Sequence, residues 1–171
     1  EEKKLRNRSE LSYKLLSYIQ QEPNEQLFGF LGYTKLWAYY QTDAPSDSAT
    51  LKKWMRKALA EPPVLYNPEM TKSSSQSMVN YLQTLGYWDA KVETDSTVKG
   101  QKVTVSYQVF PGQRYYADSV YFISRDTAIE RILRQTRKSS YLQKGVPIEI
   151  SAYRAEVGRV MRMLRDSGYF F

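Results

Sequence analysis

The chain has 171 residues and a hydrophobic share of 42%, which is enough to bury a core and excludes disorder throughout. It contains no Cys, no His and no convincingly spaced carboxylate pair, so thiol nucleophiles, Ser-His-Asp triads and nearly all zinc sites are excluded, and we expect no enzyme and no metal or cofactor. The formal net charge of +7 is compatible with an anionic partner, although basic residues spread over several predicted helices are typical of solvated faces.

The N-terminal part of the chain is predicted to be helical. Apolar residues at helical spacing predict a helix over 8–20, with Ser9 as its cap and Pro23-Asn24 as its end. A second helical stretch is expected over Leu27–Tyr40, although two glycines interrupt it. A further amphipathic helix is expected over 49–60, after a polar loop.

The middle of the chain changes from helix to strand. Pro62-Pro63 removes backbone donors, so the segment around it is expected to be extended. Ser73 and Gln76 resemble a capping box, which predicts a helix that starts there and ends at Gly86 in a left-handed conformation. Strands are then expected at the two segments of alternating polarity on either side of a turn at Lys99-Gly100, namely 88–94 and 103–109.

The C-terminal part starts again with a strand. Residues 115–123 include the apolar run Val120-Tyr121-Phe122-Ile123, which predicts an extended segment. Asp126-Thr127 is expected to open a helix, and Ser151 a second one that Gly168 ends.

A repeated phrase organises these elements. Leu82–Trp88 returns 82 positions later as Leu164–Phe170, and each copy closes an amphipathic helix with Gly and an aromatic pair. Overlaying the two copies predicts an α+β fold of tandem β-α-α-β-β modules, each with two helices on one face of a three-stranded mixed sheet. We expect one module over 1–112, with a helical insertion at about 24–62 and its first strand before Glu1, and a second, truncated module over 113–171.

The clearest candidate binding surface is the first strand of the predicted hairpin. If the second hairpin strand is central in the sheet, the first is an exposed edge to which an extended partner chain can add. The edge residues are Trp88, Asp89, Ala90, Lys91, Val92, Glu93 and Thr94. Charged residues on an edge also protect against aggregation, and Lys91 and Glu93 are suited to that role.

Aromatic residues of the predicted insertion form a second candidate surface. Trp37, Tyr40 and Trp54 lie on its predicted helices, where they are suited to docking a ligand or, as the more ordinary alternative, to joining the insertion to the module core. No phosphate-binding glycine loop is present.

The passage Leu82–Val92 resembles the second-helix-to-strand segment of POTRA domains, and Tyr115–Phe122 resembles the first strand of a following repeat. The strings Gln20–Asn24, Leu36–Tyr40 and Glu61–Val64 are similar to TamL-type relatives of BamA and TamA in Bacteroidetes, although Ala60 stands where those relatives often have Gly. The resemblance implies a non-enzymatic scaffold in the periplasm, attached to the outer membrane through a C-terminal β-barrel that is absent from this sequence. Its implied partners are unfolded outer-membrane proteins or assembly subunits, bound at a sheet edge.

Short Asp-Ser pairs resemble the O-glycosylation signal of periplasmic proteins in Bacteroidetes. The candidate acceptors are Ser96, which we expect in a hairpin loop, and Ser48. Such pairs are also ordinary loop and cap residues.

Two other classes of protein remain as alternatives. A basic nucleic-acid-binding α/β module is suggested by the charge and the aromatic residues, and it predicts steeply salt-dependent binding. Against it, the cleanest strand presents Thr104, Ser106 and Gln108 outward, so no nucleic acid is expected as a partner. The other alternative is a POTRA-like part of a cell-division or two-partner secretion protein.

Overall fold

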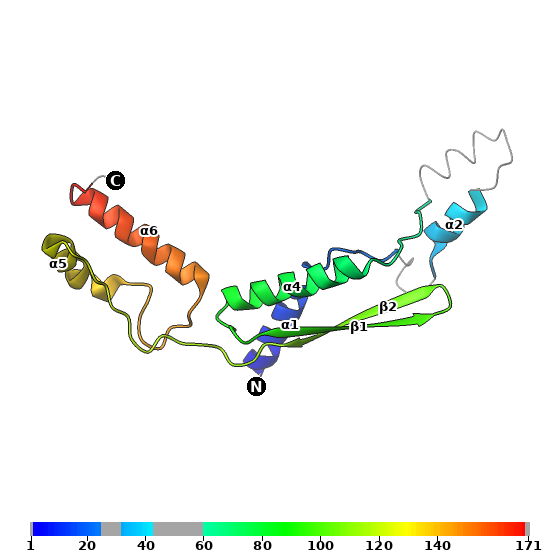
Figure 1. Ribbon diagram of the computed structural model, residues 1–171, viewed down its shortest axis with the longest axis horizontal. Coiled ribbons are helices and arrows are strands. Elements are labelled where there is room, and N and C mark those ends of the chain that lie inside the picture. The colour runs from blue at the N-terminus through cyan, green and yellow to red at the C-terminus, as the bar shows by residue number, and fades with distance from the viewer. Residues whose placement is uncertain (1, 25–31, 43–59, 170–171) are drawn as a thin grey trace. The chain divides into compact units, whose positions relative to one another are not determined.

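A computed structural model describes residues 2–24, 32–42 and 60–169 of the chain (Figure 1). The fold class is α+β, with five α-helices and one two-stranded antiparallel sheet in these residues. The elements are α1 Glu2–Leu16, α2 Thr34–Thr42, α4 Pro68–Thr84, β1 Lys91–Lys99, β2 Lys102–Phe110, α5 Thr127–Gln135, the short 3-10 helix η2 Arg137–Ser139 and α6 Ile150–Asp166. None of these helices is both long and apolar enough to cross a bilayer.

The chain divides into two compact units. Unit 1 comprises residues 1–74 and 99–103, and unit 2 comprises residues 75–98 and 104–171. Helix α4 and the β1–β2 hairpin contribute to both units, whereas α5, η2 and α6 belong to unit 2 alone.

Helix α1 corrects the predicted helix at 8–20. It begins at Glu2, so Ser9 lies inside the helix and is not its cap. It also ends at Leu16, well before Pro23, because the Ser17 backbone N–H and hydroxyl both donate to the Lys14 carbonyl, the hydroxyl at 2.7 Å. A serine that bonds to the preceding turn in this way competes with continuation of the helix.

Helix α2 accounts for the second half of the stretch predicted at Leu27–Tyr40. It begins at Thr34, two residues after Gly32, whose φ of 82° interrupts the helical conformation. Residues 27–31 and nearly all of the helix predicted at 49–60 lie outside the described residues.

Helix α4 begins five residues before the predicted capping box. Its start is set by Asn67 and Pro68: the Asn67 Oδ1 accepts from the Glu69 N–H at 2.9 Å, and Pro68 takes the first helical position, where no N–H is needed. Ser73 and Gln76 are therefore interior residues, and the capping-box prediction was wrong. The predicted end is confirmed, since Gly86 has a φ of 89°.

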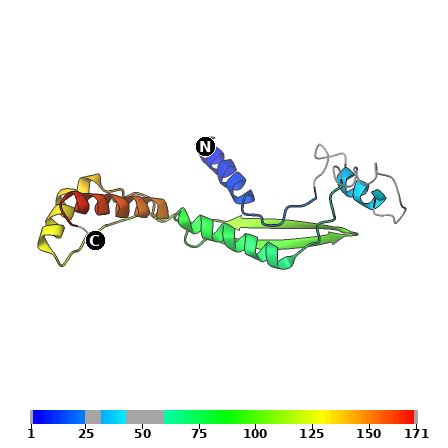
Figure 2. The same cartoon turned by 90° about the horizontal axis from the view of Figure 1, so that it is seen from above.

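The β1–β2 hairpin confirms the predicted turn, with Gly100 at a φ of 60°. In β2 the apolar residues alternate as predicted, with half-buried Val103, Val105, Tyr107 and Val109. Helix α4 runs along the hairpin in both views (Figures 1 and 2), and its Met78 and Leu82 are fully buried.

The strand predicted at 115–123 does not form in the described residues. Its only β-pairing is an isolated bridge between Tyr116 and Pro147, and Val120–Ile123 is extended without a partner strand. Residues 115–123 are not a strand because an extended segment becomes one only when another backbone pairs with it. The sheet in the described residues is the β1–β2 hairpin alone. Three strands in each module stays a prediction, because the first strand of the first module was expected before Glu1 and the second module was expected to be truncated.

The two helices after this segment agree closely with the sequence. Asp126 caps α5 by accepting from the Ala128 and Ile129 N–H groups, as predicted. Helix α6 begins at Ile150, one residue before the predicted start at Ser151, and no side chain bonds to its first N–H groups at the cap Glu149.

Helices α4 and α6 show that the repeat is structural. Both have 17 residues, and both start and end 82 positions apart. Each closes with the same two hydrogen bonds: Gly86 and Gly168 donate to the third residue before them, and the tyrosine that follows donates to the fifth residue before itself, Leu82 or Leu164.

Candidate functional site

Strand β1 is the most open element of the sheet. Of its nine residues only Val92 is half-buried, and the others are exposed. Because the sheet has two strands, no strand in the described ranges 2–24, 32–42 and 60–169 pairs with the outer edge of β1. We call the main-chain groups and side chains along Lys91–Lys99 the β1 edge.

The predicted edge residues divide into two groups. Lys91, Val92, Glu93 and Thr94 lie in β1, whereas Trp88, Asp89 and Ala90 precede it in a turn. The strand starts three residues later than predicted because the Ala90 N–H donates to the Tyr87 carbonyl and closes that turn. Ala90 is buried, and Trp88 is exposed.

Ser96 also lies at the β1 edge. We predicted it in a hairpin loop, but the loop is Gly100-Gln101, and Ser96 is an exposed strand residue. Ser48 and Trp54 lie outside the described residues.

Asp89 belongs to a polar junction just before the strand. The Tyr115 hydroxyl donates to its Oδ2 at 2.7 Å, and this bond, with the negative charge of Asp89, raises the pKa of Tyr115 above its ordinary value of 10.0. Next to it, Arg114 donates to the Leu85 carbonyl at 3.0 Å and forms an ion pair with Glu149.

A backbone ladder passes through the same junction. The Tyr115 N–H donates to the Gly86 carbonyl at 2.9 Å, and the Tyr115 carbonyl accepts from the Ile148 N–H at 3.0 Å. Gly86 is required here for two reasons, because its φ is positive and because a Cβ would lie 2.9 Å from the Ile148 carbonyl oxygen. The end of α4 is thereby tied to the segment that leads into α6.

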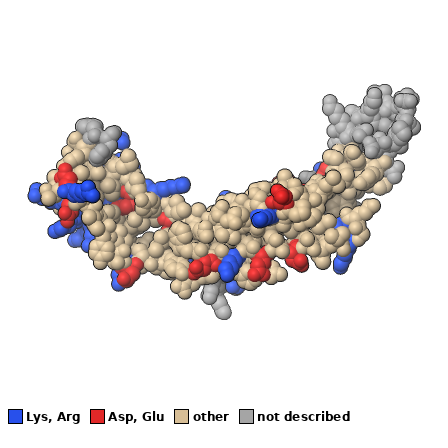
Figure 3. All heavy atoms as spheres, in the orientation of Figure 1, with Lys and Arg blue, Asp and Glu red and all other residues tan. Residues whose placement is uncertain are grey.

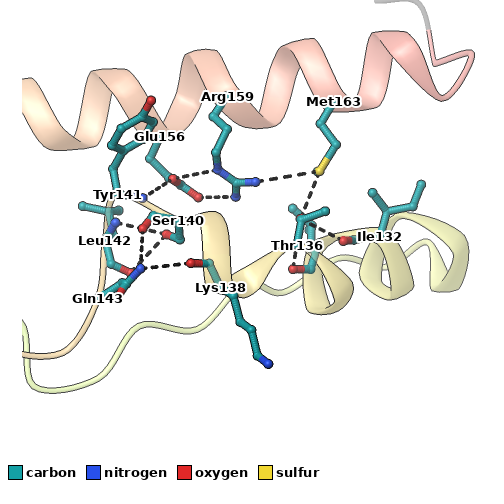
Figure 4. Close-up of polar contacts among 11 residues, drawn as sticks. Ile132, Thr136, Lys138, Ser140, Tyr141, Leu142, Gln143, Glu156, Arg159 and Met163 are labelled. Atoms are coloured by element: carbon teal, nitrogen blue, oxygen red, sulfur yellow. Dashed lines mark hydrogen bonds and ion pairs between the residues drawn. The ribbon is translucent and has the colours of Figure 1, made fainter.

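One equivalent position of each repeated helix holds a buried polar side chain that sequence analysis missed. On α4 it is Ser74, whose Oγ accepts from the Gln20 N–H at 2.9 Å and donates to the Met70 carbonyl at 2.7 Å. On α6 it is Glu156, which is 82 positions later and accepts from the Tyr141 N–H at 2.9 Å (Figure 4). In both copies the side chain accepts a backbone N–H from earlier in the chain, that of Gln20 after α1 or that of Tyr141 shortly before α6.

Glu156 is further paired with Arg159 in a nearly buried ion pair. The two groups make two hydrogen bonds, of 2.6 and 3.0 Å, and Figure 4 shows them side by side on α6. Burial alone would raise the pKa of Glu156, but hydrogen bonds from Arg159, Tyr141 and Ser140 outweigh it and lower the pKa. The signal in the sequence was a Glu and an Arg three residues apart on the apolar side of a predicted helix.

A set of side-chain amides joins two segments of unit 1 that are far apart in sequence. Asn24 donates to the Pro62 carbonyl at 2.8 Å and accepts from the Val64 N–H at 2.9 Å. Gln21 likewise donates to the Leu65 carbonyl at 2.5 Å and accepts from the Asn67 N–H at 3.0 Å. We call this the amide clasp. It replaces a strand ladder that the prolines, which lack an N–H, cannot form.

The aromatic candidates of α2 lie on the surface. Trp37 is 63% exposed and Tyr40 is 59% exposed, and the Tyr40 ring contacts Tyr39 edge-on. The alternative in which Trp37 and Tyr40 form a core is therefore wrong for these two residues.

Within the residues that the structure describes, no group of three acidic side chains could hold a metal ion. Comparison of the chain with models of known protein families, with curated proteins and with solved structures gives no match. The surface with the clearest chemistry is the β1 edge, which offers main-chain donors and acceptors to an extended partner.

Proposed function

We propose that the chain is a POTRA-type scaffold in which the β1 edge binds an extended segment of a client protein. The observation that carries this proposal is a nine-residue exposed strand whose outer edge has no partner strand in the described part of the chain. Pairing through main-chain groups makes few demands on the client's sequence, so it suits a scaffold with clients that share alternating polarity but no motif.

The tandem organisation is the second support. Helices α4 and α6 agree in length, in end geometry and in the position of a buried polar side chain, at a constant spacing of 82 residues. We propose that residues 1–112 form one module with an insertion at about 24–62, and that residues 113–171 are the first part of a second module.

The proposed setting follows from the resemblance to TamL-type proteins. The modules would lie in the periplasm, attached to the outer membrane by a C-terminal barrel of the same protein, and their clients would be unfolded outer-membrane proteins or assembly subunits. In this role the chain performs no catalysis.

The test is a photocrosslinking scan of the full-length protein in cells. A photoreactive residue is placed at each position of Lys91–Lys99 in turn, and the same scan over β2 serves as the control. Strand pairing predicts adducts with outer-membrane proteins that peak at every second position of β1, because neighbouring main-chain groups point to opposite edges. Uniform labelling along β1, or stronger adducts along β2, would contradict the proposal.

A second candidate, nucleic-acid binding, has one observation in its favour. Residues 113–171 hold 11 of the 25 Lys and Arg but only 6 of the 18 Asp and Glu. Many of the Lys and Arg in Figure 3 lie over the part of the molecule formed by α5 and α6. Titration with single-stranded DNA at two salt concentrations tests this second candidate. Affinity for DNA that falls steeply with salt would favour nucleic-acid binding.

A further inference from the structure

Arg114 joins three segments of unit 2 that are separated in the sequence. Its Nε donates to the Leu85 carbonyl at 3.0 Å, and its guanidinium forms an ion pair with Glu149. The guanidinium also lies over the Tyr87 ring, with 5.6 Å between its Cζ and the ring centre. One side chain thus connects the end of α4, the short connection after β2 and the start of α6.

Glu149 occupies the N-cap of α6, but its carboxylate does not cap the helix. No side chain there bonds to the first N–H groups. The Glu149 carboxylate instead pairs with Arg114 and accepts from the Ser151 hydroxyl at 2.9 Å. Ser, Thr, Asp and Asn cap helices best, so glutamate is a poor local choice at this position. A residue that breaks a local rule commonly serves a contact elsewhere, and here that contact is Arg114.

The backbone on both sides of Arg114 is held against the same region. Gly112 lies next to Asp89, where an added Cβ would be 3.5 Å from the Asp89 Cβ. Tyr115 bonds to the Gly86 carbonyl through its N–H and to Asp89 through its hydroxyl. These contacts leave few residues of the connection free to change φ and ψ, as a hinge requires.

We propose that Arg114 acts as a latch within unit 2. While it holds Leu85 and Glu149, the β1–β2 hairpin and α6 move as one body, and when it releases them they move independently about the connection after β2. Arg114 decides between these states because the Leu85 carbonyl and the Glu149 carboxylate are both acceptors and cannot bond to each other. The latch does not depend on what the chain binds, so the inference is independent of the proposed function.

The test measures the distance between two spin labels on the full chain by electron paramagnetic resonance. The chain has no Cys, so the labels attach only at introduced residues, Thr104→Cys on β2 and Arg162→Cys on α6, which are both exposed. The latch predicts one narrow distance distribution in the labelled chain and a broader one when Arg114→Gln is added. A distribution that is already broad without Arg114→Gln, or that stays narrow with it, would overturn the inference.

A matched control separates the latch from a general effect of charge. Lys144 forms an ion pair with Asp118 in the same unit, at 2.8 Å, but their side chains are 78% and 85% exposed. Lys144→Gln changes the net charge by the same amount as Arg114→Gln and should leave the distance distribution unchanged. Equal broadening in the two variants would refute the latch.

A milder variant covers the case in which Arg114→Gln does not fold. Glu149→Gln removes the ion pair but keeps the bond from Arg114 to Leu85, so it should broaden the distribution to an intermediate width. A distribution as narrow as that of the natural pairing would refute the latch by itself.

Hydrogen exchange locates the opening. The Tyr115 N–H bonds to Gly86 across the latch, whereas the Ala117 N–H bonds to Val146 on one side of it. In Arg114→Gln the Tyr115 amide should exchange about tenfold faster, and the Ala117 amide should exchange at an unchanged rate. Equal acceleration of both amides would contradict the inference, because it would report a general loss of structure in place of an opening at Arg114.

Discussion

Helices α4 and α6 occupy equivalent positions in the repeat, but the buried polar residue differs between them. On α4 a neutral hydroxyl, Ser74, receives the backbone N–H of Gln20. On α6 a carboxylate, Glu156, receives the N–H of Tyr141 and needs Arg159 beside it. The comparison shows that both copies use this helix position to bind a backbone N–H from earlier in the chain, although the accepting group differs.

The two solutions differ in what they risk. The free energy of moving a neutral serine hydroxyl out of water is small. For a carboxylate and a guanidinium it is large, and only their mutual contact offsets it. Stability should therefore be more sensitive to the loss of Glu156 on α6 than to the loss of Ser74 on α4. Of these two residues, only Glu156 makes a contribution to stability that depends on pH.

The largest effect is expected from Glu156→Ala. It leaves Arg159, whose side chain is 14% exposed, without its partner, and it leaves the Tyr141 N–H without an acceptor. We expect the free energy of unfolding to fall by about 3–5 kcal/mol, measured by hydrogen exchange of the α6 amides.

The matched change on α4 is Ser74→Ala. It removes the acceptor of the Gln20 N–H and one donor to the Met70 carbonyl but leaves no charge unpaired. The free energy of unfolding, measured by hydrogen exchange of the α4 amides, should therefore fall by about 1–3 kcal/mol. A larger loss for Ser74→Ala than for Glu156→Ala would contradict the comparison.

The apolar residues that close each helix are expected to have the next largest effect. Leu82 is fully buried and Leu164 is 8% exposed, so Leu82→Ala should cost about 2–5 kcal/mol and Leu164→Ala should lie at the lower end of that range. Urea unfolding of the two variants checks the order. Equal losses would mean that burial at this position does not distinguish the copies.

The two helix-ending glycines give a smaller but sharper contrast. Both have positive φ, so alanine at either position costs about 1–2 kcal/mol. At Gly86 a Cβ would also meet the Ile148 carbonyl oxygen, whereas at Gly168 nothing lies within 4 Å. Gly86→Ala should therefore lower the melting temperature more than Gly168→Ala, and the reverse order would contradict the junction geometry.

The smallest effect is a pH dependence that involves α6 alone. The pKa of Glu156 is lower than its ordinary value of 4.5, so its contribution to stability is present above that pH and is lost as the pH falls through the folded-state pKa. The difference in unfolding free energy between the natural chain and Glu156→Gln should shrink below pH 4.5. A constant difference would show that ionisation of Glu156 does not stabilise the fold.

Local signals in the sequence predicted much of the fold. Asp126 set the start of α5, Gly86 and Gly168 set the ends of their helices, and the alternation in β2 set its faces. Each of these depends on neighbouring residues and on backbone conformation. They can therefore be derived without knowing what lies nearby in space.

The errors had two causes. Val120–Ile123 has the composition of a strand but no pairing partner in the described residues, so contacts between distant segments decide its structure. The start of α4 was missed because the local signal Asn67-Pro68 was overlooked in favour of Ser73. At the candidate site, four of the seven predicted edge residues lie in β1, from Lys91 to Thr94. The hydrogen-bond partners of Ser74, Glu156 and Asn24 could not be predicted from the sequence, because these bonds join segments that are not adjacent in it.

The amide clasp has a consequence for how this protein can change over evolution. Because Asn24 bonds to Pro62, the chain returns to the point from which it left, and the distance that the intervening residues must span stays fixed. The entropy of closing a loop grows only slowly with its length, so residues can be added or removed between these positions at little cost to unit 1. Changes in the length of residues 25–61 that keep Asn24 and the Pro62-Pro63 pair should therefore leave the rest of unit 1 folded.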